Sequence, residues 1–233
     1  MYTSFFLPGT DRQLEFLLEN IDVTGLSVLI IGTGCEEISK SFSAKGAVRV
    51  NIIVDDNDSL LNSRLQLINS NINVRLMDFD NTDFKDSSFD LVYAQASVSN
   101  KKRNKISKEV YRILKPGGHF CVGEITSPSQ SPPQFITDLW KISGITPLHP
   151  KELEQFYKEK NFELVKSREL SHTLKDFYST SINMLKDNLN SLTEQEKSYY
   201  KKLLNRISHE SNAYLKLGGD AHIGFYASIL KKD

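Results

Sequence analysis

The strongest constraint on the fold is a regular alternation of short apolar segments with longer amphipathic ones. Runs rich in β-branched residues and leucine, such as 27–31 and 48–54, are typical of strands that are buried on both faces. The segments that follow them, 36–45 and 59–68, place apolar residues at helical spacing. Strands that alternate with helices in this way require crossover connections and a parallel sheet. The sequence therefore predicts a doubly wound α/β protein.

The same alternation continues to the end of the chain. Further strands are expected at 74–77, 89–94, 119–125, 162–170 and 222–230, and further helices from Thr10, over 106–114, from Pro150 and from Thr193. Thr10 with Gln13, and Thr193 with Glu196, have the spacing of capping boxes. Residues 126–148 contain four of the seven prolines and are predicted to be a long surface connection. We expect one domain over 1–233, in which 126–148 and 174–217 are insertions that cap a substrate pocket.

Composition narrows the function mainly by exclusion. Lys plus Arg and Asp plus Glu number 29 each, so the balance of charge indicates neither a nucleic-acid partner nor an anionic membrane surface. The first twelve residues lack the pattern of a secretory signal, and the apolar runs are too short to span a bilayer. The two cysteines, Cys35 and Cys121, suit a reducing compartment, and no Cys or His pair has zinc-ligand spacing. We expect a cytoplasmic protein without a metal.

A close glycine turn, Gly32-Thr33-Gly34, follows the first strand directly. It is predicted to lie at the carboxyl edge of the sheet, where ligands of this fold class bind. A dinucleotide site normally has a third glycine three residues later, but here Glu37 stands at that position with Glu36 beside it, and the two carboxylates would repel a diphosphate. A cofactor with cationic groups and no phosphate, such as S-adenosylmethionine, would tolerate them.

The next two strands each end in an aspartate. Asp55 ends the second strand, a position from which a carboxylate can accept hydrogen bonds from both ribose hydroxyls. Asp78 ends the third strand and can accept from an adenine amino group, with Phe79 beside it to cover the ring. Three successive strand ends thus offer nucleoside-binding groups.

Laid together, these segments resemble a known family. VLIIGTG, VNIIVDD, MDFDNTDFKDSSFDLVYAQ and ILKPGGHFCVGEI are similar to the successive signatures of class I S-adenosylmethionine-dependent methyltransferases, particularly the small-molecule group that includes quinone-biosynthesis enzymes. The resemblance implies a Rossmann-like sheet of seven strands, mostly parallel, with the last strand inserted antiparallel. It also implies that Gly32, Thr33 and Gly34 line the methionine moiety, Asp55 holds the ribose, and Asp78 with Phe79 holds the adenine.

The resemblance implies methyl transfer from S-adenosylmethionine to a small-molecule acceptor. Two departures from the family pattern, Ile30 in place of an acidic residue and Glu36 in place of a glycine, motivate an alternative in which the fold serves as a catalytically impaired binding or regulatory protein. A nicotinamide-dependent oxidoreductase is a second alternative. No catalytic residue is identified, but Glu124 and Gln95, each at a strand end, are candidates for positioning or deprotonating a substrate.

Overall fold

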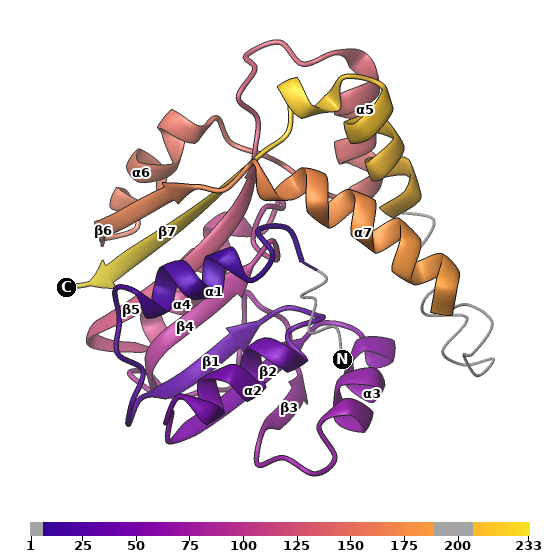
Figure 1. Ribbon diagram of the computed structural model, residues 1–233. Coiled ribbons are helices and arrows are strands. Elements are labelled where there is room, and N and C mark those ends of the chain that lie inside the picture. Colours follow the sequence, from indigo (N-terminus) through magenta and orange to yellow (C-terminus); the bar gives the residue numbers. More distant parts are fainter. Residues whose placement is uncertain (1–6, 189–206) are drawn as a thin grey trace.

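The computed structural model describes residues 7–188 and 207–233, which form a twisted sheet covered by helices on both faces (Figure 1). The strands are β1 (Ser27–Ile31), β2 (Arg49–Val54), β3 (Asn73–Leu76), β4 (Phe89–Gln95), β5 (Leu114–Thr126), β6 (Phe162–Glu169) and β7 (Gly224–Lys232). The helices are α1 (Arg12–Leu18), α2 (Glu36–Ala44), α3 (Asn57–Gln66), α4 (Arg103–Ile113), α5 (Gln134–Ser143), α6 (Pro150–Lys158) and α7 (Thr173–Asn188), followed by a helical segment at 207–216 and a short 3₁₀ turn, Gly219–Ala221.

The seven strands lie in the order β3-β2-β1-β4-β5-β7-β6. Neighbouring strands from β3 to β5 are parallel, whereas β7 pairs antiparallel with both β5 and β6. The carboxyl ends of β1, β2, β3 and β4 therefore meet at one edge. This arrangement confirms the predicted sheet, including the antiparallel last strand.

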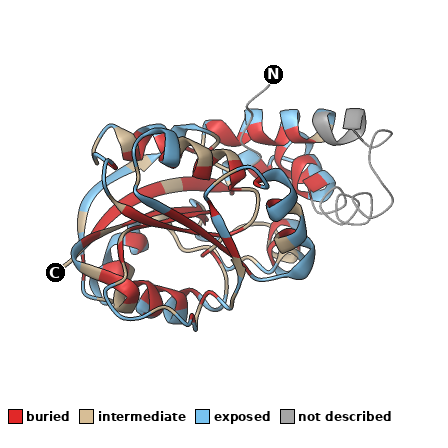
Figure 2. Ribbon diagram, turned by 90° about the horizontal axis from the view of Figure 1, so that it is seen from below, coloured by how far each residue is buried: buried red, intermediate tan, exposed pale blue. Residues whose placement is uncertain are grey.

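Two apolar cores enclose the sheet, because successive side chains of a strand point to opposite faces. Ile30 and Ile52 pack with α1 and α2 on one face. Leu29 and Ile53 pack with α4 and α6 on the other. Figure 2 shows the result: the strands between the two edges are buried along most of their length, and the covering helices turn a buried side inward and an exposed side to solvent. The edge strands β3 and β6 are mostly exposed or half-buried.

The beginnings of two early helices differ from the sequence-based expectation. α1 begins at Arg12, and Thr10 has a positive φ of 48° and forms no cap, while the Gln13 amide reaches instead to the Ala94 carbonyl at 3.0 Å. The predicted capping box of Thr10 and Gln13 is therefore wrong. α3 is capped by Asp56, whose carboxylate accepts from the backbone N–H of Ser59 at 2.8 Å.

The apolar spacing that predicted α3 does not mark its buried side. Leu61, Leu65 and Ile68 are exposed, and the side of the helix that faces the protein carries the buried Ser59 and Ser63. The cause is a polar group beneath the helix: Ser63 donates to the buried carboxylate of Glu36 at 2.5 Å. Helical spacing of leucines indicated a helix here, but it did not identify the buried side.

The proline-rich segment 126–148 is only partly a surface connection, because it contains α5. Ile136, Leu139 and Trp140 are buried at helical spacing, and Gly144 ends the helix in the left-handed region, with φ 67°. α5 lies beside α7 and the helix at 207–216 at one end of the molecule (Figure 1). The contacts that join them include a hydrogen bond from Ser143 to Glu210 and the tilted ring pair of Tyr178 and Tyr214. The predicted capping box at Thr193 and Glu196 lies outside the described residues.

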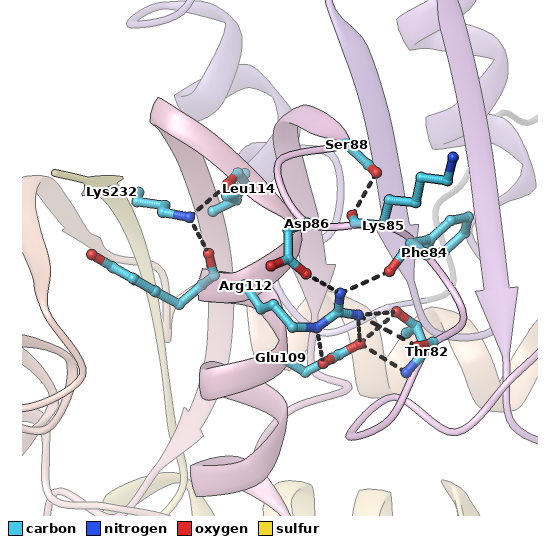
Figure 3. Close-up of polar contacts among 10 residues, drawn as sticks. Thr82, Phe84, Lys85, Asp86, Ser88, Glu109, Arg112, Leu114 and Lys232 are labelled. Carbon is cyan, nitrogen blue, oxygen red and sulfur yellow. Dashed lines mark hydrogen bonds and ion pairs between the residues drawn. The ribbon is translucent and has the colours of Figure 1, made fainter.

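The loop after β3, residues 77–88, is attached to α4 by a charged network (Figure 3). Glu109 accepts from the Thr82 backbone N–H at 2.8 Å and from Arg112 at 2.6 Å. Arg112 also donates to the Phe84 carbonyl and to the Asp86 carboxylate. The network holds the loop on which Phe79 approaches the carboxyl edge of the sheet.

Candidate functional site

A cavity of ≈330 Å³ opens at the carboxyl edge of the sheet, between the ends of the early strands and the helices at α5, α7 and 207–216. Its lining comes from segments far apart in the sequence. On the sheet side it is lined by Gly32, Thr33, Gly34, Asp55, Phe79, Gln95, Ala96, Ser97, Ser99, Asn100 and Ile125, and on the other side by Leu7, Pro8, Ser143, Gly144, Ile145, Phe177, Ile207 and Glu210.

The glycine turn approaches the cavity through its backbone. Gly32 and Gly34 have φ of +127° and +74°, a region that L residues with side chains rarely adopt. A Cβ at Gly32 would lie 2.9 Å from the Cβ of Ser97, whose hydroxyl donates to the Ile31 carbonyl at 2.7 Å. Space and conformation therefore both require glycine at Gly32. The turn presents main chain, without side-chain bulk, to whatever occupies the cavity.

Asp55 and Phe79 complete the sheet side of the cavity, as their strand-end positions predicted. Asp55 follows β2, and this residue is exposed at the cavity. Partial desolvation raises the pKa of its carboxyl, and the nearby carboxylates of Asp56 and Asp78 add to the effect. Phe79 follows β3 and is 8% exposed, so one ring can contact both the cavity and the core.

Asp78 is placed differently from its two partners in the prediction. Its side chain is 71% exposed and lies 3.8 Å from the Lys102 ammonium, and it is not among the residues that line the cavity. Lys102 also donates to Asp80 at 2.8 Å, and this hydrogen bond lowers the pKa of the Asp80 carboxyl. The adenine-binding role of Asp78 stays a prediction.

The residues that depart from the family pattern point away from the cavity. Ile30 is fully buried in the core beside α2. Glu36 is 5% exposed and accepts from Ser63 on α3, and Glu37 pairs on the surface with Lys40 at 2.6 Å. The sequence predicts that both glutamates would repel a diphosphate in the site. This prediction is wrong, because neither carboxylate faces the cavity.

Glu124 does not face the cavity, contrary to the position inferred for it at the end of β5. Its side chain is 1% exposed and is held by three donors: Arg103 at 2.7 Å, Ser99 at 3.0 Å and Tyr157 at 2.5 Å. Burial, followed by the neighbouring carboxylate, raises the pKa of Tyr157 well above its ordinary value, so the phenol stays a donor. Glu124 is not among the residues that line the cavity, although Ser99, one of its three donors, is.

Gln95 does line the cavity and is 2% exposed, with its amide bound to protein groups on both sides. The opposite wall includes Ser143, Phe177 and Glu210, which lie in 126–148 and 174–217, the two segments predicted to cap the pocket, but sequence reasoning named none of the three individually. No short motif joins these positions. A helical signal was nevertheless present in the buried spacing of α5 and in Gly144 after it.

Residues 7–188 and 207–233 contain neither a membrane-spanning helix nor a cluster of metal-binding side chains. No helix in this part of the chain is long and apolar enough to cross a bilayer. In the same part, no group of three or more His, Cys, Asp or Glu side chains is arranged to hold a metal ion.

Sequence comparison finds a methyltransferase domain family model that matches residues 29–122. A ubiquinone/menaquinone biosynthesis C-methyltransferase UbiE of Haemophilus ducreyi is 28% identical, over 63% of this chain and 68% of its own. A sterol methyltransferase-like protein of Botryococcus braunii is 27% identical, over 60% of this chain and 39% of its own length. The sterol 24-C-methyltransferase of Yarrowia lipolytica is 32% identical, over 51% of this chain and 33% of its own length. The chain thus spans well under two thirds of both sterol-methyltransferase relatives.

Solved structures share the fold at low sequence identity. A putative sarcosine dimethylglycine methyltransferase from Galdieria sulphuraria superposes with a TM-score of 0.74 over 94% of this chain and 83% of that one, at 14% identity. A phosphoethanolamine N-methyltransferase of Haemonchus contortus superposes with a TM-score of 0.77 over 95% of this chain and 52% of that one, at 15% identity. The matched segment, the relatives and the strand order with its antiparallel β7 thus confirm the predicted resemblance to class I S-adenosylmethionine-dependent methyltransferases.

Proposed function

We propose that the protein transfers a methyl group from S-adenosylmethionine to a small-molecule acceptor held in the cavity. One observation supports this most directly: the glycine turn, Asp55 and Phe79 leave three successive strands and line the same cavity. Their chemistry suits the successive parts of one adenosyl cofactor, namely main chain for the methionine portion, a carboxylate for the ribose hydroxyls and an aromatic ring for the base.

The charges that line the cavity also suit this cofactor. Cationic sulfonium and amino groups need no phosphate site, and neither a Lys nor an Arg lines the cavity within the described residues. A nicotinamide dinucleotide would be less well accommodated, because its diphosphate needs a helix N-terminus preceded by the full glycine fingerprint. The antiparallel β7 between β5 and β6 also departs from the all-parallel dinucleotide sheet.

The cofactor supplies an activated methyl group, so the residues of this chain need mainly to bind, orient and exclude water. Asp55 and the glycine turn fix one reactant against the sheet. We propose that α5, α7 and the helix at 207–216 form a cap, which shapes the acceptor side through Phe177 and Ser143 and limits the entry of water. Glu124 takes no part, since its oxygens are bound within the protein.

Calorimetry with S-adenosylmethionine and S-adenosylhomocysteine tests the cofactor assignment directly. We expect saturable binding of both, and we expect Asp55→Asn to weaken both. Transfer of labelled methyl groups into pools of small metabolites then tests turnover and finds the acceptor. Absence of binding to either compound would contradict the proposed function.

The alternative of a catalytically impaired relative has one structural observation in its favour. Ile30 stands where the family has an acidic residue, and it is sealed in the core, so no carboxylate from β1 is available at the site. Binding of the cofactor without transfer to any acceptor would favour this alternative. Binding together with transfer would exclude it.

A further inference from the structure

A strap of residues near the beginning of the described chain, 7–10, crosses the cavity beside the glycine turn. Leu7 and Pro8 line the cavity, and Leu7 lies 3.7 Å from the position that a Cβ on Gly34 would occupy. Gly9 packs on the Phe225 ring, where its own Cβ would clash at 2.3 Å. The strap is thus fitted closely over the part of the site where the glycine turn lies.

One side chain fastens the strap to the sheet. The Gln95 amide nitrogen donates to the carbonyl oxygens of Pro8 and Thr10, each at 2.8 Å. Gln95 is the last residue of β4 and is 2% exposed, so the two bonds form in a site from which water is largely excluded. Hydrogen bonds in such surroundings are electrostatically stronger than exposed ones.

A second residue sets the direction of that amide. The Tyr93 hydroxyl donates to Gln95 Oε1 at 2.6 Å, which leaves the NH₂ group facing the strap. Burial raises the pKa of Tyr93 well above its ordinary value, so its proton stays in place. The Tyr93 ring is itself held edge-on by Phe42, with centroids 5.5 Å apart. A flipped amide would set Oε1 against two carbonyl oxygens, so this orientation is specified.

We propose that Gln95 is a positioning residue for methyl transfer: its amide latches strap 7–10 over the cavity and thereby controls how tightly the cofactor is held. The proposal rests on the proposed function for the identity of the ligand. It assigns Gln95 no contact with a proton that is transferred. Both hydrogens of its amide are already donated to the strap, and an amide is not a base near neutral pH.

Three variants test the latch. Gln95→Glu replaces the NH₂ donor with an acceptor that faces two carbonyls, and Tyr93→Phe removes only the hydroxyl that orients the amide. Gln155→Glu makes the same chemical change on α6, where Gln155 is exposed and bonds only Glu159, and it serves as the matched control. Each protein is measured for S-adenosylhomocysteine affinity by calorimetry, for amide hydrogen exchange over residues 7–16, and for thermal unfolding.

We expect Gln95→Glu to raise the Kd for S-adenosylhomocysteine by about ten- to a hundredfold, the value of two lost hydrogen bonds. Exchange over 7–16 should quicken in the free protein, and the ligand should no longer slow it. Tyr93→Phe should show both effects more weakly, and Gln155→Glu neither. If Gln95 had a purely structural role, its substitution would lower the unfolding temperature and quicken amide hydrogen exchange throughout the sheet. Exchange in the rest of the sheet is therefore the internal reference for exchange over residues 7–16.

Failure of the proposed function can be distinguished from failure of the latch. If the wild-type protein binds no S-adenosylhomocysteine, the proposed function fails, and exchange in the free variants still decides whether the latch exists. If Gln95→Glu leaves exchange over 7–16 unchanged, the latch is wrong. If exchange quickens while affinity stays the same, the strap does not control the cofactor, and the proposal is overturned.

Discussion

Asp55 and Glu124 occupy equivalent places in the fold, yet their surroundings are opposite. Each is a carboxylate at or near the carboxyl end of a parallel strand, β2 and β5. Asp55 is exposed and lines the cavity. Glu124 is 1% exposed and is bound by Arg103, Ser99 and Tyr157.

The difference shows that a strand-end position admits an acidic residue without fixing its role. What decides the role is whether neighbouring elements bring donors to the carboxylate. α4 supplies Arg103 and α6 supplies Tyr157, and together they seal Glu124 beneath the sheet edge. Among the described residues, no side-chain donor is bonded to the Asp55 carboxylate, and desolvation instead raises the pKa of this carboxyl. We therefore expect Glu124 to act on stability and Asp55 to act on binding.

Glu124→Gln should produce the largest effect. Removing one charge of a buried ion pair leaves the Arg103 guanidinium, 6% exposed, without its counter-charge. We expect a loss of about 3–5 kcal/mol in the free energy of unfolding, measured by denaturant titration. Cofactor affinity of the folded fraction should stay close to that of the wild type.

Tyr157→Phe is the control for this prediction, because it removes a donor to Glu124 and leaves the ion pair intact. It should cost less, about 1–3 kcal/mol. A Glu124→Gln protein that unfolds normally but has lost its binding or turnover would show that the carboxylate serves the site after all.

Asp55→Asn should have the opposite effect to Glu124→Gln, weakening cofactor binding without lowering stability. Loss of a charged acceptor for the ribose hydroxyls is expected to weaken S-adenosylhomocysteine binding by about 1.5–3 kcal/mol, or roughly ten- to a hundredfold. The raised pKa of Asp55 means that its ionised form opposes folding at neutral pH. The free variant should therefore unfold at the same temperature as the wild type or slightly above it. A clear drop in stability would contradict the assignment of Asp55 to binding.

The sequence predicted the sheet well because burial on both faces leaves an unmistakable pattern. β1 occupies Ser27–Ile31 as expected, and every one of its residues is buried. The glycine turn and Asp55 followed from the same pattern, since the end of a buried parallel strand locates the site edge. Phe79 was found in the same way.

What the sequence could not show depends on tertiary partners. Glu124 and Asp55 differ only through residues brought from other elements. The buried side of α3 is set by Glu36, which accepts from the Ser63 hydroxyl, so the spacing of the leucines predicted the helix without showing which side is buried. The wall formed by α5, α7 and 207–216 combines positions that share no local motif.

Glu36 extends the comparison, because it is a third acidic residue beside the site edge and is sealed like Glu124. Ser63→Ala removes the hydroxyl donor to a carboxylate that is 5% exposed. We expect a loss of about 1–3 kcal/mol in the free energy of unfolding, with cofactor affinity unchanged. The exposed Ser43→Ala on α2 is the control and should change neither. Weakened binding in Ser63→Ala would place Glu36 within the site.

The smallest expected effect is a pH dependence that belongs to Asp55 alone. The ionised form is the acceptor that we propose for the ribose hydroxyls, so we expect full affinity above the pKa of Asp55 and a loss of affinity as pH drops through it. Because that pKa is raised, the fall should begin at a higher pH than for an ordinary aspartate, whose pKa is about 3.9. Below it, the Kd for S-adenosylhomocysteine should rise by up to about tenfold per pH unit, and calorimetry across this range measures it. Asp55→Asn is the control, because titration of the ligand itself affects the wild type and the variant equally. The Kd values of the two proteins should converge at low pH. Parallel curves of Kd against pH would mean that Asp55 does not hold the cofactor.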